Sequence, residues 1–490
     1  MLKGKLLPKL VLAAMSAMLV MAAGCTPNPQ KETQTQRSLK VMFYDESYFF
    51  QQYGDLFAMQ YPDVDVEVIS TQSIYSGDEV TDYNKAIRDF IKKEQPDVVM
   101  LGMENYEKMV SDGELMELDA MIERDKYNTE TIYPALIEML KEKGGGKLYG
   151  LSPTFSADAV FYNVDLFNKY GVELPHDGMT WADILELARR FPTDGDDKTR
   201  IYGFGERYGG MSFSSLAQRI ASAEGLSAVN PDTLKVTLNT DSWKKAYKTA
   251  LDAVESKAVY NPEDGGFMGG TMEEYYKSQL FLVGRMAMTI GDPYTLQSLK
   301  DVKNSLKDYK PFELGMVSGP VDPTDPETTR SIYFSDLFGI RAGSPNADAA
   351  WDFLKFINGE DFARIKSRTM NNGILSRMGF NKDYDGHSLE VFYKLKPKLS
   401  NDSYERMEKI PMEFYQEYQQ ILDREMALVE KKSKSIDEAL QAVEQEGQAA
   451  LDKAVKDKEA KKGSEDSADG SGSESSSSAG SSVIIVEPSN

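Results

Sequence analysis

The first third of the sequence alternates between strand and helix patterns, and this alternation constrains the fold more than any other feature. Residues 39–44 and 64–68 predict strands, and residues 47–60 between them predict a helix with an aromatic face. The pattern repeats with a helix around 83–91 and the apolar run 98–101, which is typical of a strand covered on both faces. Because strand, helix and strand at this spacing form a parallel unit, we predict an α/β fold.

Apolar stripes and capping residues predict further helices along the chain. They are a helix over 180–190 capped by Thr180, helices over 241–256 and 346–357, and a last helix opened by a capping box of Ser435 and Glu438. The three tryptophans, Trp181, Trp243 and Trp351, all lie on such stripes. We therefore expect them to pack in the core rather than to stack on a ligand.

The N-terminus has the organisation of a bacterial lipoprotein leader. A lysine-rich start, an apolar run and three small residues precede Cys25, the only cysteine. The apolar run is too short to span a bilayer, so residues 1–24 predict a cleaved signal peptide and Cys25 predicts the lipidated residue. Residues 25–38 are polar and contain two prolines, which is typical of a flexible tether. The alternative is an ordinary secretory signal followed by a chance cysteine.

The net charge of −22 disfavours nucleic acid and anionic lipid surfaces as partners. No second apolar stretch is long enough for a transmembrane helix, so everything after Cys25 is expected outside the membrane. Residues 463–490 are acidic and rich in serine and glycine, and this composition predicts a disordered tail.

The usual catalytic motifs are missing from the sequence. It has no G-x-S-x-G elbow, no H-E-x-x-H pair and no C-x-x-C, and it contains only two histidines. We therefore predict a protein that is not an enzyme and needs no cofactor, although a carboxylate pair for glycan hydrolysis could arise by chance among 78 acids. Asp194 and Asp196 are weak candidates for a calcium loop, and a plain acidic turn is the alternative.

From Lys147 onward the sequence resembles the family 1 extracellular solute-binding proteins of ATP-driven importers, which include the maltose-binding protein. The most specific stretch is GKLYGLSPTFSADAVFYNVDLFNKYGVELPHDGMTWADILELARRF. The segments QPDVVMLGMENYEKMVSDGELMELDAMI, FLVGRMAMTIGDPYTL, FGIRAGSPNADAAWDFLKFI and SIDEAL follow the family pattern in order. The resemblance implies a two-lobe, periplasmic-binding-protein-like (type II) fold with crossover hinge strands. Lobe 1 would comprise residues 39–151 and 339–371, and lobe 2 residues 152–338 and 372–460.

The candidate ligand residues follow strand ends, because ligands of open α/β sheets sit beyond the carboxyl ends of the strands. One wall would contain Asp45, Glu46, Tyr48, Met103, Glu104 and Asn105. The other would contain Thr154, Phe155, Ser156, Tyr162, Asp292, Pro293 and Tyr294, with Arg207, Tyr208 and Tyr415 as further candidates. By resemblance, Tyr294 would stack on a pyranose, Tyr162 would line the cleft and Glu104 would bond the ligand. The alternatives are that Tyr162 only packs and that Glu104 is a solvated acid at a helix start.

These observations predict a membrane-anchored receptor on the extracytoplasmic face of the cell membrane. It would be a monomer that captures a carbohydrate and delivers it to the permease subunits of an ABC transporter. Two other functions remain open, a surface-attached glycan hydrolase and a sensory solute-binding lipoprotein without transport. Peptides, polyamines and other small polar solutes also remain open as ligands.

Overall fold

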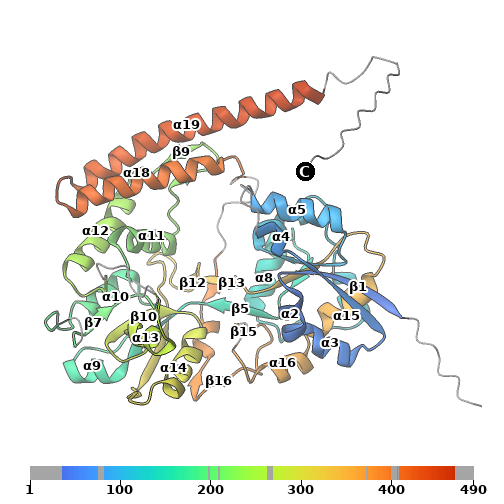
Figure 1. Ribbon diagram of the computed structural model, residues 1–490, viewed down its shortest axis with the longest axis horizontal. Helices are drawn as coiled ribbons and strands as arrows, with labels where there is room; N and C mark the ends of the chain where they lie inside the picture. Colours follow the sequence, from blue (N-terminus) through green and yellow to red (C-terminus); the bar gives the residue numbers. More distant parts are fainter. Residues whose placement is uncertain are drawn as a thin grey trace, which may run out of the picture.

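The computed structural model has two α/β lobes that lie side by side and are joined at the centre by short strands (Figure 1). It describes residues 36–75, 82–196, 199–207, 210–261, 269–370, 373–398, 406 and 408–469. The predicted signal peptide, Cys25, Tyr208 and nearly all of the predicted tether lie outside the described residues. The predicted two-lobe fold is confirmed.

Lobe 1 is built on a five-stranded sheet in the order β2-β1-β3-β14-β4. The strands are β1 (Arg37–Phe43), β2 (Val64–Ser70), β3 (Val98–Leu101), β4 (Gly150–Leu151) and β14 (Leu337–Ile340). β1 pairs in parallel with both β2 and β3, as the strand–helix–strand pattern predicts. The sheet and its helices bury a core that contains the fully buried Trp351.

The helix predicted over residues 47–60 is interrupted. It consists of α2 (Glu46–Phe49), a π-helical turn η1 (Phe50–Gly54) and α3 (Asp55–Gln60). A π turn inserts an extra residue into the helical repeat and is frequent at functional sites. The turn directs the side chains of Gln52 and Tyr53 into the protein, where both are almost fully buried.

The other helices of lobe 1 lie around its sheet (Figure 1). They are α4 (Gln72–Tyr75), α5 (Tyr83–Glu94), α6 (Met103–Ser111), α7 (Asp119–Arg124), α8 (Pro134–Lys143), α15 (Ala347–Ile357) and α16 (Glu360–Lys366).

Lobe 2 is built on a four-stranded sheet in the order β11-β6-β10-β7. The strands are β6 (Ala159–Asn163), β7 (Tyr202–Phe204), β10 (Met286–Gly291) and β11 (Leu314–Ser318). The helices are α9 (Val164–Tyr170), α10 (Trp181–Ala188), α11 (Phe213–Ala223), α12 (Asp241–Glu255), α13 (Met272–Ser278), α14 (Tyr294–Ser305) and α18 (Met412–Glu430). Trp181 and Trp243 belong to its buried core, as predicted.

Short elements complete the chain. They are β8 (Val229–Asn230), β9 (Lys235–Val236), β12 (Thr328–Thr329), β16 (Asp383–Tyr384), β17 (His387–Ser388), the 3₁₀-helix η2 (Glu390–Tyr393) and β18 (Lys396–Pro397).

The last helix, α19 (Ile436–Asp469), crosses the top of lobe 2 in Figure 1 and packs against α18. The predicted capping box is confirmed, because the Ser435 hydroxyl and backbone N–H both donate to the Glu438 carboxylate at 2.7 and 2.9 Å. The helix continues to Asp469, past residue 463, where the sequence predicted a disordered tail. Once a helix is nucleated, each further residue adds a hydrogen bond, so the helix extends into the polar segment. Residues 470–490 lie outside the described residues.

A three-stranded sheet connects the lobes. Its central strand β5 (Thr154–Ala157) pairs antiparallel with β13 (Ile332–Phe334) and with β15 (Ile374–Leu375). The sequence predicted that residues 154–156 follow a strand, and the structure shows that they form a strand of their own. Pairing with β13 and β15 satisfies the backbone of this short segment.

Among the described residues, no helix combines the length and the apolar character that crossing a membrane requires.

Candidate functional site

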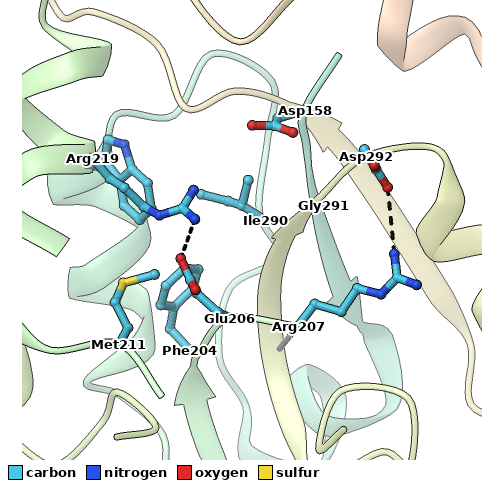
Figure 2. Close-up of a pocket in the computed structure, with 10 residues that line it drawn as sticks. Asp158, Phe204, Glu206, Arg207, Met211, Arg219, Ile290, Gly291 and Asp292 are labelled. Atoms are coloured by element: carbon cyan, nitrogen blue, oxygen red, sulfur yellow. Dashed lines mark ion pairs between the residues drawn. The ribbon is translucent and has the colours of Figure 1, made fainter. Parts of the chain in front are cut away.

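An open pocket lies in lobe 2, where β7 and β10 end, with a volume of about 600 Å³ that includes the space open to solvent (Figure 2). Because these two strands are parallel, their carboxyl ends meet at the same edge of the sheet. The junction between β5 and β6 and the helix α11 complete the walls. The residues that line the pocket are Asp158, Trp181, Phe204, Glu206, Arg207, Met211, Arg219, Ile290, Gly291 and Asp292.

The base of the pocket is apolar and belongs to the lobe 2 core. Thr180 caps α10 and accepts a hydrogen bond from the Asp183 N–H, which fixes Trp181 as the first residue of the helix. The indole packs edge to face on Phe204, with ring centroids 5.6 Å apart. Trp181 therefore has two roles, because it is a core residue, as predicted, and also a wall of the pocket.

Two arginine–carboxylate pairs cross the pocket. Arg219 on α11 contacts Glu206 at 2.5 Å, and Arg207 contacts Asp292 at 3.6 Å. Burial raises the pKa of Glu206, and the neighbouring Arg219 opposes this shift. The Arg207 side chain is only 8% exposed and also donates to the Ser298 hydroxyl, so its guanidinium is held in place before any ligand arrives.

Asp158 is the third carboxylate of the pocket and lies between β5 and β6. Burial raises its pKa to about 6, the Asp292 carboxylate adds to the increase, and Arg219 and a hydrogen bond with Ser331 oppose it. A carboxyl group in this state can accept a hydrogen bond when ionised and donate one when protonated.

Asp292 joins the pocket to Tyr294. Its carboxylate accepts the Tyr294 N–H at 3.0 Å and contacts Arg207. Tyr294 is the first residue of α14 and its side chain is 47% exposed. The Arg207 guanidinium carbon lies 5.1 Å from the centre of its ring. The structure thus brings together Asp292, Tyr294 and Arg207, three of the residues suggested by the sequence.

The predicted lobe 1 residues lie at the ends of the adjacent parallel strands β1 and β3. Asp45 caps α2 by accepting the Tyr48 N–H at 2.9 Å, and Glu46 is exposed. Glu104 is exposed in the first turn of α6 and accepts a hydrogen bond from the Asn84 amide at 2.5 Å. Tyr48 is half-buried, and burial raises its pKa. None of these residues lines the lobe 2 pocket.

Three predicted residues lie elsewhere. Phe155 is fully buried in the connecting sheet, with Tyr133 and Tyr393 against its ring, so it has no surface for a ligand. Tyr162 pairs with Met288 at the end of β6 opposite the pocket, and its ring packs on Phe167. Tyr415 is half-buried on α18, against Phe414.

Two further residues that the sequence suggested, Asn105 and Asp196, form hydrogen bonds that stabilise the local structure. Asn105 is buried and accepts a hydrogen bond from Arg88. Asp196 accepts bonds from the N–H and the hydroxyl of Thr199, which is the pattern of an acidic turn. Within the described residues, no group of three or more histidine, cysteine or acidic side chains could hold a metal ion.

The sequence did not single out Asp158, Glu206 or Arg219. Two of them had a signal: Asp158 is an acid between two buried strands, and Glu206 comes two residues after the end of β7. Arg219 is one of the polar residues of an amphipathic helix, and only the packing of α11 shows its position.

Comparison with known proteins gives one family. The model of the family described as bacterial extracellular solute-binding protein matches residues 36–363. A protein of Brucella abortus (strain 2308), described as a binding protein, is 27% identical over 239 residues, which cover 47% of this chain and 51% of the relative. The chain therefore spans about half the length of the curated relatives it matches.

Solved structures share the fold over most of the chain. An ABC substrate-binding protein from Listeria monocytogenes in complex with cycloalternan has a TM-score of 0.55 and 20% identity, covering 85% of this chain and 99% of its own. A sugar transporter protein from Rhizobium etli in an open conformation has a TM-score of 0.58 and 21% identity, covering 84% and 99%. At these identities the likeness shows the fold alone.

Proposed function

This chain belongs to the bacterial extracellular solute-binding proteins, and from that premise we propose that it captures a carbohydrate between its lobes and delivers it to the permease of an ABC importer. The lobe 2 pocket beside Tyr294 is the observation that carries the proposal.

The chemistry of the pocket suits a sugar. Hydroxyl groups need planar donors and acceptors in fixed positions, and the two arginine–carboxylate pairs supply both. The apolar C–H face of a pyranose needs a flat aromatic surface, which the exposed ring of Tyr294 supplies at the pocket. Two of the similar folds belong to proteins described with cycloalternan or as a sugar transporter, which supports the same ligand class.

Capture would close the lobes around the ligand. On the proposed function, the lobe 1 side of the cleft contains Asp45, Glu46 and Glu104. Closure about the three connecting strands would bring these residues towards a sugar held in lobe 2. A ligand that contacts both lobes stabilises the closed state over the open one. A permease that prefers the closed state would then select the loaded receptor.

The same proposal includes attachment to the membrane. The leader would be cleaved before Cys25, and a lipid on Cys25 would hold the receptor, as a monomer, at the extracytoplasmic face of the cell membrane. Labelling cells with a fatty acid analogue tests this part, since a Cys25→Ser protein should take up no lipid.

A ligand screen followed by substitution of Tyr294 tests the proposed ligand class. The mature protein is first screened by thermal shift against mono- and oligosaccharides, peptides and polyamines, because a specific ligand raises the unfolding temperature. Calorimetry then compares two variants with the hit. We expect Tyr294→Ala to weaken binding by more than about tenfold, whereas Tyr294→Phe keeps the flat ring and most of the affinity.

Four results would count against the proposal. Unchanged affinity in Tyr294→Ala would remove this residue from the site, and a screen in which only peptides or polyamines bind would exclude a carbohydrate receptor. New reducing ends on incubation with polysaccharides would identify a hydrolase instead. Normal sugar uptake after deletion of the gene would favour a sensory role.

A further inference from the structure

A separate cavity lies between lobe 1 and the connecting strands and shares no lining residue with the lobe 2 pocket. It has a volume of about 300 Å³, including the space open to solvent. Lobe 1 contributes η1 and α16, and the connecting sheet contributes β5 and β15. We call it the hinge cavity, and the residues that matter here are Gln52, Tyr53, Phe362, Lys366, Thr154 and Leu375.

Lys366 brings a positive charge to this cavity, and no carboxylate of the described residues forms an ion pair with it. Its ammonium donates to the Gln51 carbonyl and to the Gln52 side-chain oxygen, both at 3.4 Å. Both partners are neutral, and both distances are longer than a usual N–H···O bond. Burial lowers the pKa of Lys366, and among the described residues no carboxylate opposes that shift. A partly desolvated cation of this kind gains free energy when an anion joins it.

Thr154 brings an unused donor to the same cavity. It is only 6% exposed, and its hydroxyl has no hydrogen-bond partner among the described residues. A buried hydroxyl without a partner costs free energy, so a ligand that accepts its proton is favoured. The Asp336 carboxylate accepts the Tyr53 hydroxyl at 2.5 Å, and the Thr154 hydroxyl makes no hydrogen bond to it.

We propose that the hinge cavity binds a small inorganic anion of the size of chloride, held by the Lys366 ammonium and the Thr154 hydroxyl. The walls formed by Phe362 and Leu375 are apolar, and two donors suit a weakly hydrated monovalent ion better than a phosphate, which needs more.

Because of the position of the cavity, an anion bound there would affect the closure of the lobes. Lys366 belongs to lobe 1 and Thr154 to a strand that connects the lobes, so the two donors shift relative to one another when the lobes rotate. An anion that binds one arrangement better changes the closure equilibrium, and by reciprocity the captured solute changes the anion affinity.

The test uses the mature protein without any sugar, so it is independent of the ligand proposed for the cleft. Sodium gluconate is replaced stepwise by sodium chloride at constant ionic strength, and the unfolding temperature is recorded. We expect a saturable rise of about 1–2 °C in the natural protein. Lys303→Met, which removes an exposed lysine on α14, should give the same rise.

Lys366→Met should show no saturable rise, and in gluconate it should be at least as stable as the natural protein, because an uncompensated cation is gone. Thr154→Val removes only the hydroxyl and should weaken chloride binding by about tenfold. Bromide-soaked crystals should give an anomalous peak between the two side chains. Equal rises in the natural protein and Lys366→Met, or bromide elsewhere only, would overturn the proposal.

Discussion

The two walls of the cleft differ in how firmly their polar groups are held. In lobe 2 the Arg207 guanidinium is 8% exposed and fixed by Asp292 and Ser298. In lobe 1 the candidate acids Glu46 and Glu104 are exposed side chains at helix starts. Ordering an exposed side chain on binding costs about 0.5–1.5 kcal/mol, so under the proposed function the lobe 2 residues would contribute more net affinity per contact. Lobe 2 would then recognise the ligand, and lobe 1 would complete the contact after closure.

Removing the aromatic base of the lobe 2 wall should have the largest effect. Trp181 is 4% exposed and packs on Phe204, so Trp181→Ala should lower the free energy of unfolding by about 3–5 kcal/mol. Tyr48→Ala, in the half-buried lobe 1 wall, should cost about 1–2 kcal/mol. Urea denaturation measures both. Equal losses would mean that the two walls are equally embedded in their lobes.

Asp158 should make the stability of the protein depend on pH. Its pKa is raised to about 6 by burial, so the folded state binds the proton more tightly than the unfolded state. The resulting stabilisation is fully present below about pH 4 and is lost as the pH rises through about 6. At pH 7.5 we expect Asp158→Asn to be more stable than the natural protein by about 2 kcal/mol.

The greater stability of Asp158→Asn should disappear near pH 4. Denaturation at several pH values measures this change. Some pH dependence should remain in the variant, because burial also raises the pKa of Glu206. Glu104→Gln serves as the lobe 1 control. An advantage that persists unchanged at low pH would show that Asp158 is not titrating in the folded protein.

The sequence predicted what is encoded locally. Thr180 and Asp183, or Ser435 and Glu438, lie three residues apart, so each helix start can be read from one short segment. The pocket brings together Asp158, Arg219 and Asp292 from segments far apart in the chain, through the sheet order β11-β6-β10-β7. That order is a tertiary property. Asp292, which follows a strand end, was therefore suggested by the sequence, whereas Arg219 on the flank of a helix was not.

Phe155 shows a different reason for failure. The segment from Thr154 to Ala157 is buried at every position, and it is too short to show a period. A loop and a strand covered on both faces then look alike in the sequence. The hydrogen bonds to β13 and β15, which decide between them, come from residues that lie more than a hundred positions further along the chain.

The smallest effect is expected at the lobe 1 acid. Glu104 is exposed, and within the described part of the chain its side chain accepts one hydrogen bond, from Asn84 on a neighbouring helix. Glu104→Gln should therefore change the free energy of unfolding by less than about 0.5 kcal/mol. If lobe 1 contacts the ligand only after closure, the same variant should reduce ligand affinity by no more than about tenfold, mainly through faster dissociation. Stopped-flow measurement of both rate constants, with Asn84→Ala as a variant that frees the carboxylate, separates the two steps. A slower association in Glu104→Gln would mean that lobe 1 takes part in the first encounter, and the division of labour between the two walls would then be wrong.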